Sequence, residues 1–430
     1  ASSAFDAAQA RSVTYRYVAD AFDPIERFDA NVGWRPASTP LVRAVSAGDQ
    51  ERVGVALSSA WRVHAFANAT GDSIGLADYF SGVALRRAEL SATQAHAQNT
   101  QMIVLKLDVA PVFQHLDGSV LQVSGEALTV RFATDGDALT HFTLSQDQVV
   151  STLMNEMSGW RVFSHEMTGS AQIEPTPIDV SGLGRMAGIN YYPSDTPWSK
   201  FWTEFDPTVV ERDFELVNEL GANTVRFFLS DADFRGKTRD ASLRKLETFL
   251  ALAEAKELTL VPTLFDMKAG YGPARWAEDV AYLEAVLPVL AASDAVAMID
   301  LKNEPDLDFE SYTRPLVEAW IRTMGTVSKG IAPDLPVTIG WSDAVPAIDF
   351  ANVVDVVTYH EYTDLDGTQA RLDAVRQAAG EKPVYSTVKR GSARRLRSKV
   401  QVVRAPACSP ANQQVRVEGD HRRRRGVRRP

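Results

Sequence analysis

The stretch VAMIDLKNEPD, residues 296–306, is the clearest guide to the fold of this 430-residue chain. Its first six residues are apolar except for Asp300, and polar residues follow one another at its end as Lys302, Asn303 and Glu304. An apolar run without alternation is typical of a parallel strand that is buried on both faces. Functional side chains of parallel barrels lie at the carboxyl ends of the strands, so this polar ending predicts a site.

The same pattern recurs on both sides of this stretch, where short apolar strands alternate with longer helical patterns, as βα units do. The predicted strands are residues 186–192, 223–230, 259–266, 296–304, 336–343, 354–362 and 382–387. The predicted helices are residues 207–220, 241–258, 273–292, 312–330 and 367–379. Together they predict an α/β fold, a (β/α)8 barrel of the TIM type over residues 181–388 that lacks its eighth unit.

Residues 1–180 have a different order, with helical stretches first and β-branched strands after them. This order predicts a small α+β accessory domain. It weakly resembles the domains that are similar to nuclear transport factor 2. The histidines of this segment are scattered singly, so we interpret each as a surface or structural residue; they are His64, His96, His115, His141 and His165.

Charge divides the chain unevenly. The whole chain has a formal net charge of −10, yet residues 389–430 contain 14 Lys and Arg against 2 Asp and Glu. The body is therefore strongly acidic, which disfavours nucleic acid and anionic membranes as its partners. No apolar run is long enough to predict a membrane-spanning helix. The single cysteine, Cys408, excludes an internal disulfide framework and a CxxC metal site.

Polar residues that end the predicted strands point to a known family. Asn303-Glu304-Pro305 closes the fourth strand, Arg226 ends the second, and His360 and Tyr362 end the sixth as His-Glu-Tyr. In this order, over about residues 185–388, the chain resembles the cellulase-type clan of glycoside hydrolases, and most of all glycoside hydrolase family 5 with its cellulases and mannanases.

This resemblance implies a role for each matching residue. Glu304 would be the acid/base, with a raised pKa, and Asn303 would donate a hydrogen bond to the sugar 2-hydroxyl. Arg226 and Tyr362 would orient the nucleophile, and His360 would line the subsite of the reacting sugar.

For the other candidate substrate contacts, the sequence leaves open whether the side chain binds the sugar or packs in the protein. Asp266 ends the third strand, where the family often has histidine, so we weigh a sugar contact evenly against a structural role. Trp341, after the fifth strand, is the best aromatic platform for a sugar, with a capping aromatic as the alternative. The weaker candidates near the first strand are Tyr191, Tyr192, Trp198 and Trp202.

The nucleophile of the family is missing. The seventh strand should end with a glutamate, and Val388 stands at that position, with no acidic residue before Glu418. A valine cannot form the glycosyl-enzyme intermediate, so we predict little or no hydrolysis by this chain. A shift of the reading frame near codon 388 would explain both the valine and the arginine-rich residues 389–430. A disordered tail or a basic arm that binds nucleic acid are the alternatives.

We therefore expect a retaining glycoside hydrolase that acts on a β-linked polysaccharide or oligosaccharide, with its nucleophile lost. The alternative is a non-catalytic protein that binds glycans. The chemistry requires neither a metal nor an organic cofactor, and we expect a secreted or periplasmic protein, although residues 1–10 show no signal peptide.

Overall fold

The computed structural model describes residues 32–156, 159–266, 268, 270–362, 365–389, 400–404 and 413–417. For residues 365–366, 387–389 and the last two ranges it describes the backbone alone. By its contacts the chain divides into two compact units, and each is described here by itself. Two segments from the barrel sequence, Ala269–Glu284 and Asp308–Val327, cluster with the first unit.

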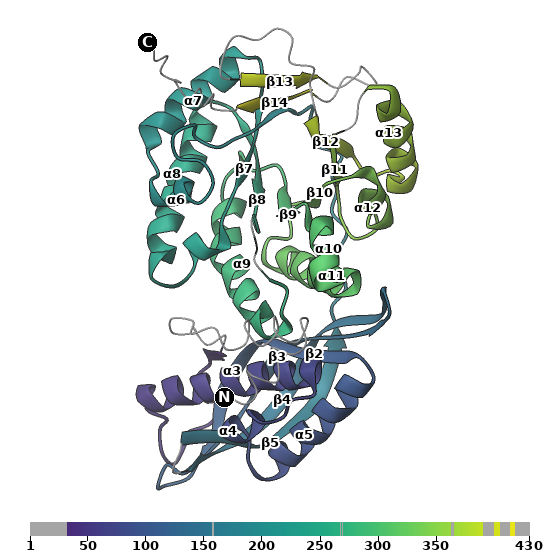
Figure 1. The fold of residues 1–430 in the computed structure, drawn as a ribbon. Coiled ribbons are helices and arrows are strands. Elements are labelled where there is room, and N and C mark those ends of the chain that lie inside the picture. The colour runs from purple at the N-terminus through teal and green to yellow at the C-terminus, as the bar shows by residue number, and fades with distance from the viewer. Residues whose placement is uncertain are drawn as a thin grey trace, which may run out of the picture. The chain divides into compact units, whose positions relative to one another are not determined.

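The first unit contains a curved sheet with helices on one face (Figure 1). Its strands lie in the order β1 to β5, with β1 parallel to β2 and every other pair antiparallel. The strands are β1 (Val32–Trp34), β2 (Thr100–Gln114), β3 (Val120–Asp135), β4 (Ala138–Glu156) and β5 (Gly159–Gln172). The helices are α3 (Ala47–Thr70), α4 (Leu76–Tyr79) and α5 (Gly82–Ala97). The α+β character predicted for this part is confirmed.

Helix α3 is bounded by its end residues. The side chain of Ser46 accepts a hydrogen bond from the backbone N–H of Asp49 at the start, and Gly71 ends the helix with a positive φ of 75°. Ser and Gly are the residue types that such helix ends favour. The apolar side of α3 packs on alternate residues of the strands to form the core of the unit.

Two histidines that are far apart in the sequence meet in this core. His64 on α3 and His165 on β5 contact the Trp61 ring edge to face, with centroids 5.7 and 4.5 Å away. Burial lowers the pKa of His64 to about 4, and His165 adds to this effect. His64 is 3% exposed and is therefore neutral in the folded chain at pH 7.

We expect the His64 side chain to make the stability of this unit fall as the pH falls. The unfolded chain binds a proton at His64 near pH 6.5 and the folded chain near pH 4, so stability is lost between these values. Between pH 7 and 5 the loss is about 2 kcal/mol. Urea unfolding of the full chain at both pH values measures it. Burial also lowers the pKa of His165 to about 4, so His64→Phe should reduce this slope without removing it, whereas the exposed control His141→Gln should keep the full slope. Equal slopes for the two variants would contradict the prediction.

The second unit contains a parallel sheet, which confirms the predicted TIM-like fold class (Figure 1). Seven strands, β6 to β12, pair in sequence order with parallel neighbours. They are β6 (Ala187–Asn190), β7 (Thr224–Phe228), β8 (Thr259–Thr263), β9 (Ile299–Asn303), β10 (Val337–Trp341), β11 (Val357–Glu361) and β12 (Val384–Lys389). The sheet is curled as part of a barrel, and each strand lies within or next to its predicted range.

Helices follow the strands as the βα pattern predicts. They are α6 (Lys200–Thr203), α7 (Pro207–Glu219), α8 (Arg239–Ala255), α9 (Trp276–Ala291), α10 (Phe309–Tyr312), α11 (Arg314–Ile331), α12 (Ala344–Asp349) and α13 (Leu365–Ala379). Every residue of β7, β10 and β11 is buried, because in this sheet both faces of a strand are covered. No helix in the described part of the chain is both long and apolar enough to cross a membrane.

Two further strands fall within residues 389–430. They are β13 (Val400–Arg404) and β14 (Gln413–Val417), which pair with each other, and β14 also pairs in parallel with β6. The rest of that segment, from residue 390 on, lies outside the described residues. Its interpretation as a frame-shifted or disordered tail stays a prediction.

Candidate active site

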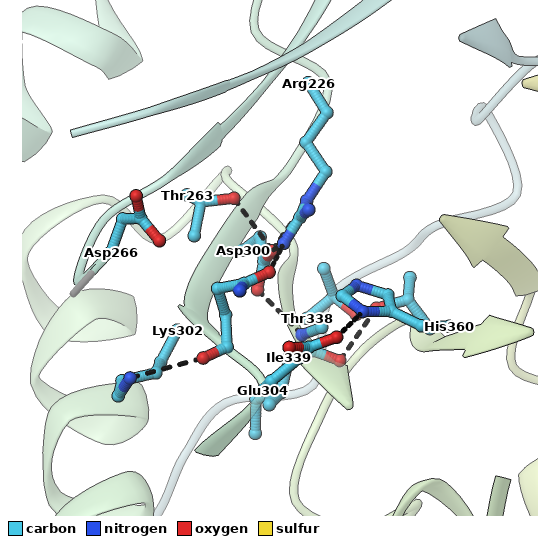
Figure 2. A network of polar contacts seen from close by, with 12 residues as sticks. Arg226, Thr263, Asp266, Asp300, Lys302, Glu304, Thr338, Ile339 and His360 are labelled. Carbon is cyan, nitrogen blue, oxygen red and sulfur yellow. Dashed lines mark hydrogen bonds and ion pairs between the residues drawn. The ribbon is translucent and has the colours of Figure 1, made fainter. Parts of the chain in front are cut away.

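The polar side chains that the sequence places at strand ends form one network in the second unit (Figure 2). Arg226 comes from β7, Asn303 and the following Glu304 from β9, and His360 from β11. The parallel order of the strands brings their carboxyl ends to the same edge of the sheet, so residues far apart in the sequence meet there. Side-chain hydrogen bonds join the predicted site residues in two groups, Arg226 with Asn303 and Glu304 with His360 and Tyr362.

A buried ion pair between Arg226 and Asp300 anchors the network, and the sequence analysis did not identify Asp300 as part of it. Asp300 is 1% exposed and accepts hydrogen bonds from Arg226 Nε at 2.9 Å and from its terminal nitrogen at 2.5 Å. Thr263 and the backbone N–H of Gly340 also donate to Asp300, at 2.9 and 2.8 Å. The sequence could have predicted a structural role for Asp300, since it is the single acidic residue inside an apolar strand.

Position 340 on β10 requires glycine, because the side chains of Arg226 and Asp300 lie very close to its Cα. A Cβ atom at this position would lie 2.7 Å from an Arg226 nitrogen and 2.9 Å from Asp300 Oδ2. Both side chains are fixed by their ion pair and cannot move aside cheaply. A side chain at position 340 would therefore disrupt the base of the site.

Arg226 also orients Asn303. Its terminal nitrogen donates to Asn303 Oδ1 at 2.9 Å, which fixes the amide so that Nδ2 is directed elsewhere. Among the described residues Nδ2 has no hydrogen-bond partner. The amide can therefore donate to a ligand, as the sequence-based prediction for a sugar hydroxyl requires.

Glu304 is held by its backbone and by one carboxylate oxygen. Its φ is 47°, in the left-handed region, and its N–H donates to the Gly340 carbonyl at 2.7 Å. Oε1 accepts hydrogen bonds from His360 Nδ1 at 2.6 Å and from the Tyr362 hydroxyl at 2.7 Å. Oε2 has no partner within the described part of the chain. One oxygen is thus anchored while the other is available to a ligand.

The expected raised pKa of Glu304 is wrong for this structure. Burial by itself raises the pKa of the carboxyl, but the hydrogen bonds from His360 and Tyr362 outweigh it, and the pKa falls to about 2. The physical reason is that two donors stabilise the charged form while position 388 supplies no second carboxylate. Glu304 is therefore ionised at neutral pH and can accept a proton.

The roles predicted for Arg226 and Tyr362 toward a nucleophile stay predictions, because this chain has a valine at the nucleophile position 388. Tyr362 donates to Glu304, and Arg226 is bound to Asp300 and Asn303. The backbone of Val388 on β12 pairs in register with His360, so the position itself lies beside the strand that contacts Glu304.

Asp266 lies beyond β8 and is 8% exposed. Tyr192 donates to its Oδ2 at 2.5 Å, and burial raises the pKa of the carboxyl despite this bond. The Tyr192 ring stacks on Phe228 at 4.8 Å and lies 5.0 Å from the Trp198 ring, which is 56% exposed. The Trp198 ring is thus exposed, and the Tyr192 ring beside it donates a hydrogen bond to the Asp266 carboxylate.

The remaining aromatic candidates are packing residues. Trp341 is 1% exposed and stacks on Phe350 at 4.7 Å, so its ring is covered and the predicted sugar platform is wrong at this residue. Tyr191 and Trp202 are also buried, which agrees with the packing interpretation. Within the described residues no group of acidic, histidine or cysteine side chains could hold a metal ion.

Comparisons with known proteins find similarity in solved structures alone. No family model and no curated protein matches the sequence. The exo-β-1,4-mannosidase Op5Man5 from Opitutaceae bacterium strain TAV5 is 23% identical with a TM-score of 0.42, over 50% of this chain and 48% of that one. GH5_18 from Streptomyces cattleya in complex with GlcNAc is 18% identical with a TM-score of 0.39, over 47% and 62%.

The endo-1,4-β-mannanase from Eisenia fetida is 13% identical with a TM-score of 0.33, over 47% of this chain and 72% of that one. These similar structures are glycoside hydrolases, and several carry the family 5 name that the sequence motifs resemble. This chain spans about half to three fifths of the length of the first ones.

Proposed function

We propose that this chain carries the glycan site of a retaining β-glycoside hydrolase in which Glu304 holds the acid/base position. The substrate class is a β-linked polysaccharide or oligosaccharide of the cellulose or mannan type, and the protein acts outside the cytoplasm, in the periplasm or the medium. The observation that carries the proposal is the geometry of Glu304, whose Oε1 is anchored by His360 and Tyr362 while Oε2 has no partner among the described residues.

The chemistry of such a site needs two carboxyl groups about 5 Å apart, one of which attacks the anomeric carbon. Glu304 supplies one of them, and Val388 cannot supply the other. As written, the chain should therefore bind its glycan and leave the β-glycosidic bond intact. A glycan-binding protein without turnover is the second candidate, and the same missing carboxylate favours it.

Isothermal titration of the full chain with cellohexaose and mannohexaose tests this proposal. We expect one of them to bind, and we expect no new reducing ends after long incubation. Absence of binding to both would contradict the glycan site, and release of reducing ends would contradict the loss of turnover.

Trp198→Ala should weaken this binding about two- to twelvefold, because a stacked aromatic face contributes about 0.5–1.5 kcal/mol. The ring is 56% exposed and lies against Tyr192, which donates to Asp266. Titration with the better ligand measures the loss. Phe113→Ala removes another exposed aromatic ring, in the first unit, and should leave the affinity unchanged. Equal affinities for the two variants would exclude Trp198 from the site.

A further inference from the structure

Helix α7 carries an apolar stripe along the edge that faces away from α8. On its other edge α7 lies beside α8 (Figure 1), where Lys256 pairs with Glu215 at 2.8 Å. The stripe consists of Val209, Leu216 and Leu220, with Asp213 between them. Leu216 and Leu220 are 43% and 37% exposed, so within the described part of the chain the stripe is open to a partner.

The spacing of the stripe is that of a seam between two helices. Its four residues follow one another at intervals of four, three and four, the spacing at which the side chains of one helix meet those of a second helix. The buried residues Val210, Phe214 and Val217 face the unit's own core. The stripe therefore extends the apolar face of α7 beyond that core, where a second helix can cover it.

Asp213 does not prevent the burial of this stripe. Its carboxylate accepts hydrogen bonds from the Tyr191 hydroxyl and from Arg212, both at 3.1 Å, and its side chain is only 12% exposed. The charge is thus already paired inside its own chain. A polar residue in a helix seam specifies the register of the two helices, so Asp213 restricts how a partner helix can dock.

Two exposed residues of opposite charge border the stripe on its solvent side. They are Arg212, whose side chain is 60% exposed, and Glu219, which follows two turns later. Glu219 has no ion-pair partner among the described residues. In an antiparallel pair of α7 helices related by a two-fold axis, Arg212 of each copy lies opposite Glu219 of the other. The charged border is therefore complementary to itself.

We propose that α7 pairs antiparallel with α7 of a second copy of this chain, and that the apolar stripe and two Arg212–Glu219 ion pairs form the interface. A second copy is the partner that fits, because a two-fold interface requires a surface that complements itself. The inference goes beyond the proposed function and is independent of it, since α7 contributes no residue to the candidate active site.

Sedimentation velocity of the full chain at rising protein concentration tests this proposal. We expect a reversible equilibrium between monomer and dimer. Leu216→Glu should weaken the dimer by about tenfold or more, because it places an unpaired charge in an apolar seam. Leu90→Glu replaces another exposed helical leucine, on α5 of the first unit, and should leave the dimer unchanged. Circular dichroism verifies that all variants are folded.

An exchange of charges tests the antiparallel orientation. Arg212→Glu and Glu219→Arg should each weaken self-association by about tenfold, because each places like charges opposite one another. An equimolar mixture of the two variants should dimerise as the original chain does, since every charge then meets its opposite in the mixed pair. The variant that carries both substitutions should dimerise by itself for the same reason.

Three results would overturn the proposal. A monomer at every concentration means that no second copy covers the stripe, whether it is solvated or bound by another segment of the same chain. A dimer that persists in Leu216→Glu places the interface elsewhere. If neither the mixture nor the double variant recovers the dimer, Arg212 and Glu219 do not pair between antiparallel helices.

Discussion

Replacing Val388 by glutamate is expected to turn this chain into a hydrolase of aryl β-glycosides. Position 388 on β12 pairs in register with His360, whose ring nitrogen is 2.6 Å from Glu304. A carboxylate at this position would complete the pair that double displacement needs. Judged from the loss on removing a nucleophile in other hydrolases, the gain should be on the order of 10⁴-fold or more.

Release of p-nitrophenol from p-nitrophenyl β-mannoside and p-nitrophenyl β-glucoside measures the gain in rate. Proton NMR of the first sugar product should show retention of configuration at the anomeric carbon. Val388→Gln is the matched control, because it has the length of glutamate without the charge that attacks. Equal rates for the two variants, or an inverted product, would contradict the assignment of position 388.

The same substitution should change the protonation of Glu304. In the chain as written its pKa is about 2, because two hydrogen bonds to the charged form outweigh burial. A second negative charge nearby favours the protonated form and raises this pKa. The rate of hydrolysis by Val388→Glu should therefore fall at high pH as Glu304 loses its proton.

The barrel and most of its site could be predicted from the sequence because parallel strands leave a simple pattern. Each strand is a short apolar run with polar residues at its end, and this pattern is enough to locate Arg226, Asn303, Glu304 and His360. The antiparallel strands of the first unit leave a weaker pattern in the sequence. On β4 the polar residue Asp147 is buried beside Arg131 at 2.6 Å, at a position where the pattern of a half-buried strand favours an apolar residue.

Contacts that depend on side-chain direction could not be predicted. The sequence does not tell whether Tyr362 turns toward position 388 or toward Glu304, and that choice sets the pKa of Glu304. The burial of Trp341 likewise depends on Phe350, at the end of α12, which stacks on its ring. Residue type and spacing indicated the candidate site, whereas its electrostatics depend on the packed geometry.

Arg226→Leu should destabilise the second unit by about 3–5 kcal/mol, because it leaves Asp300 as a buried charge without its cation. Asp300 is 1% exposed, and Arg226 donates to it through two nitrogens. Urea unfolding followed by tryptophan fluorescence measures the loss. Lys256→Gln breaks the more exposed pair with Glu215 and should cost less than about 1 kcal/mol.

A second substitution separates the charge from the packing. If the unpaired charge of Asp300 causes the loss, then Arg226→Leu combined with Asp300→Asn should recover part of the stability, since an amide is less costly to bury than a carboxylate. No recovery would assign the loss to packing instead. Glycan binding should stay impaired in the double variant in either case, because Asn303 Oδ1 has lost the donor that orients its amide toward the ligand.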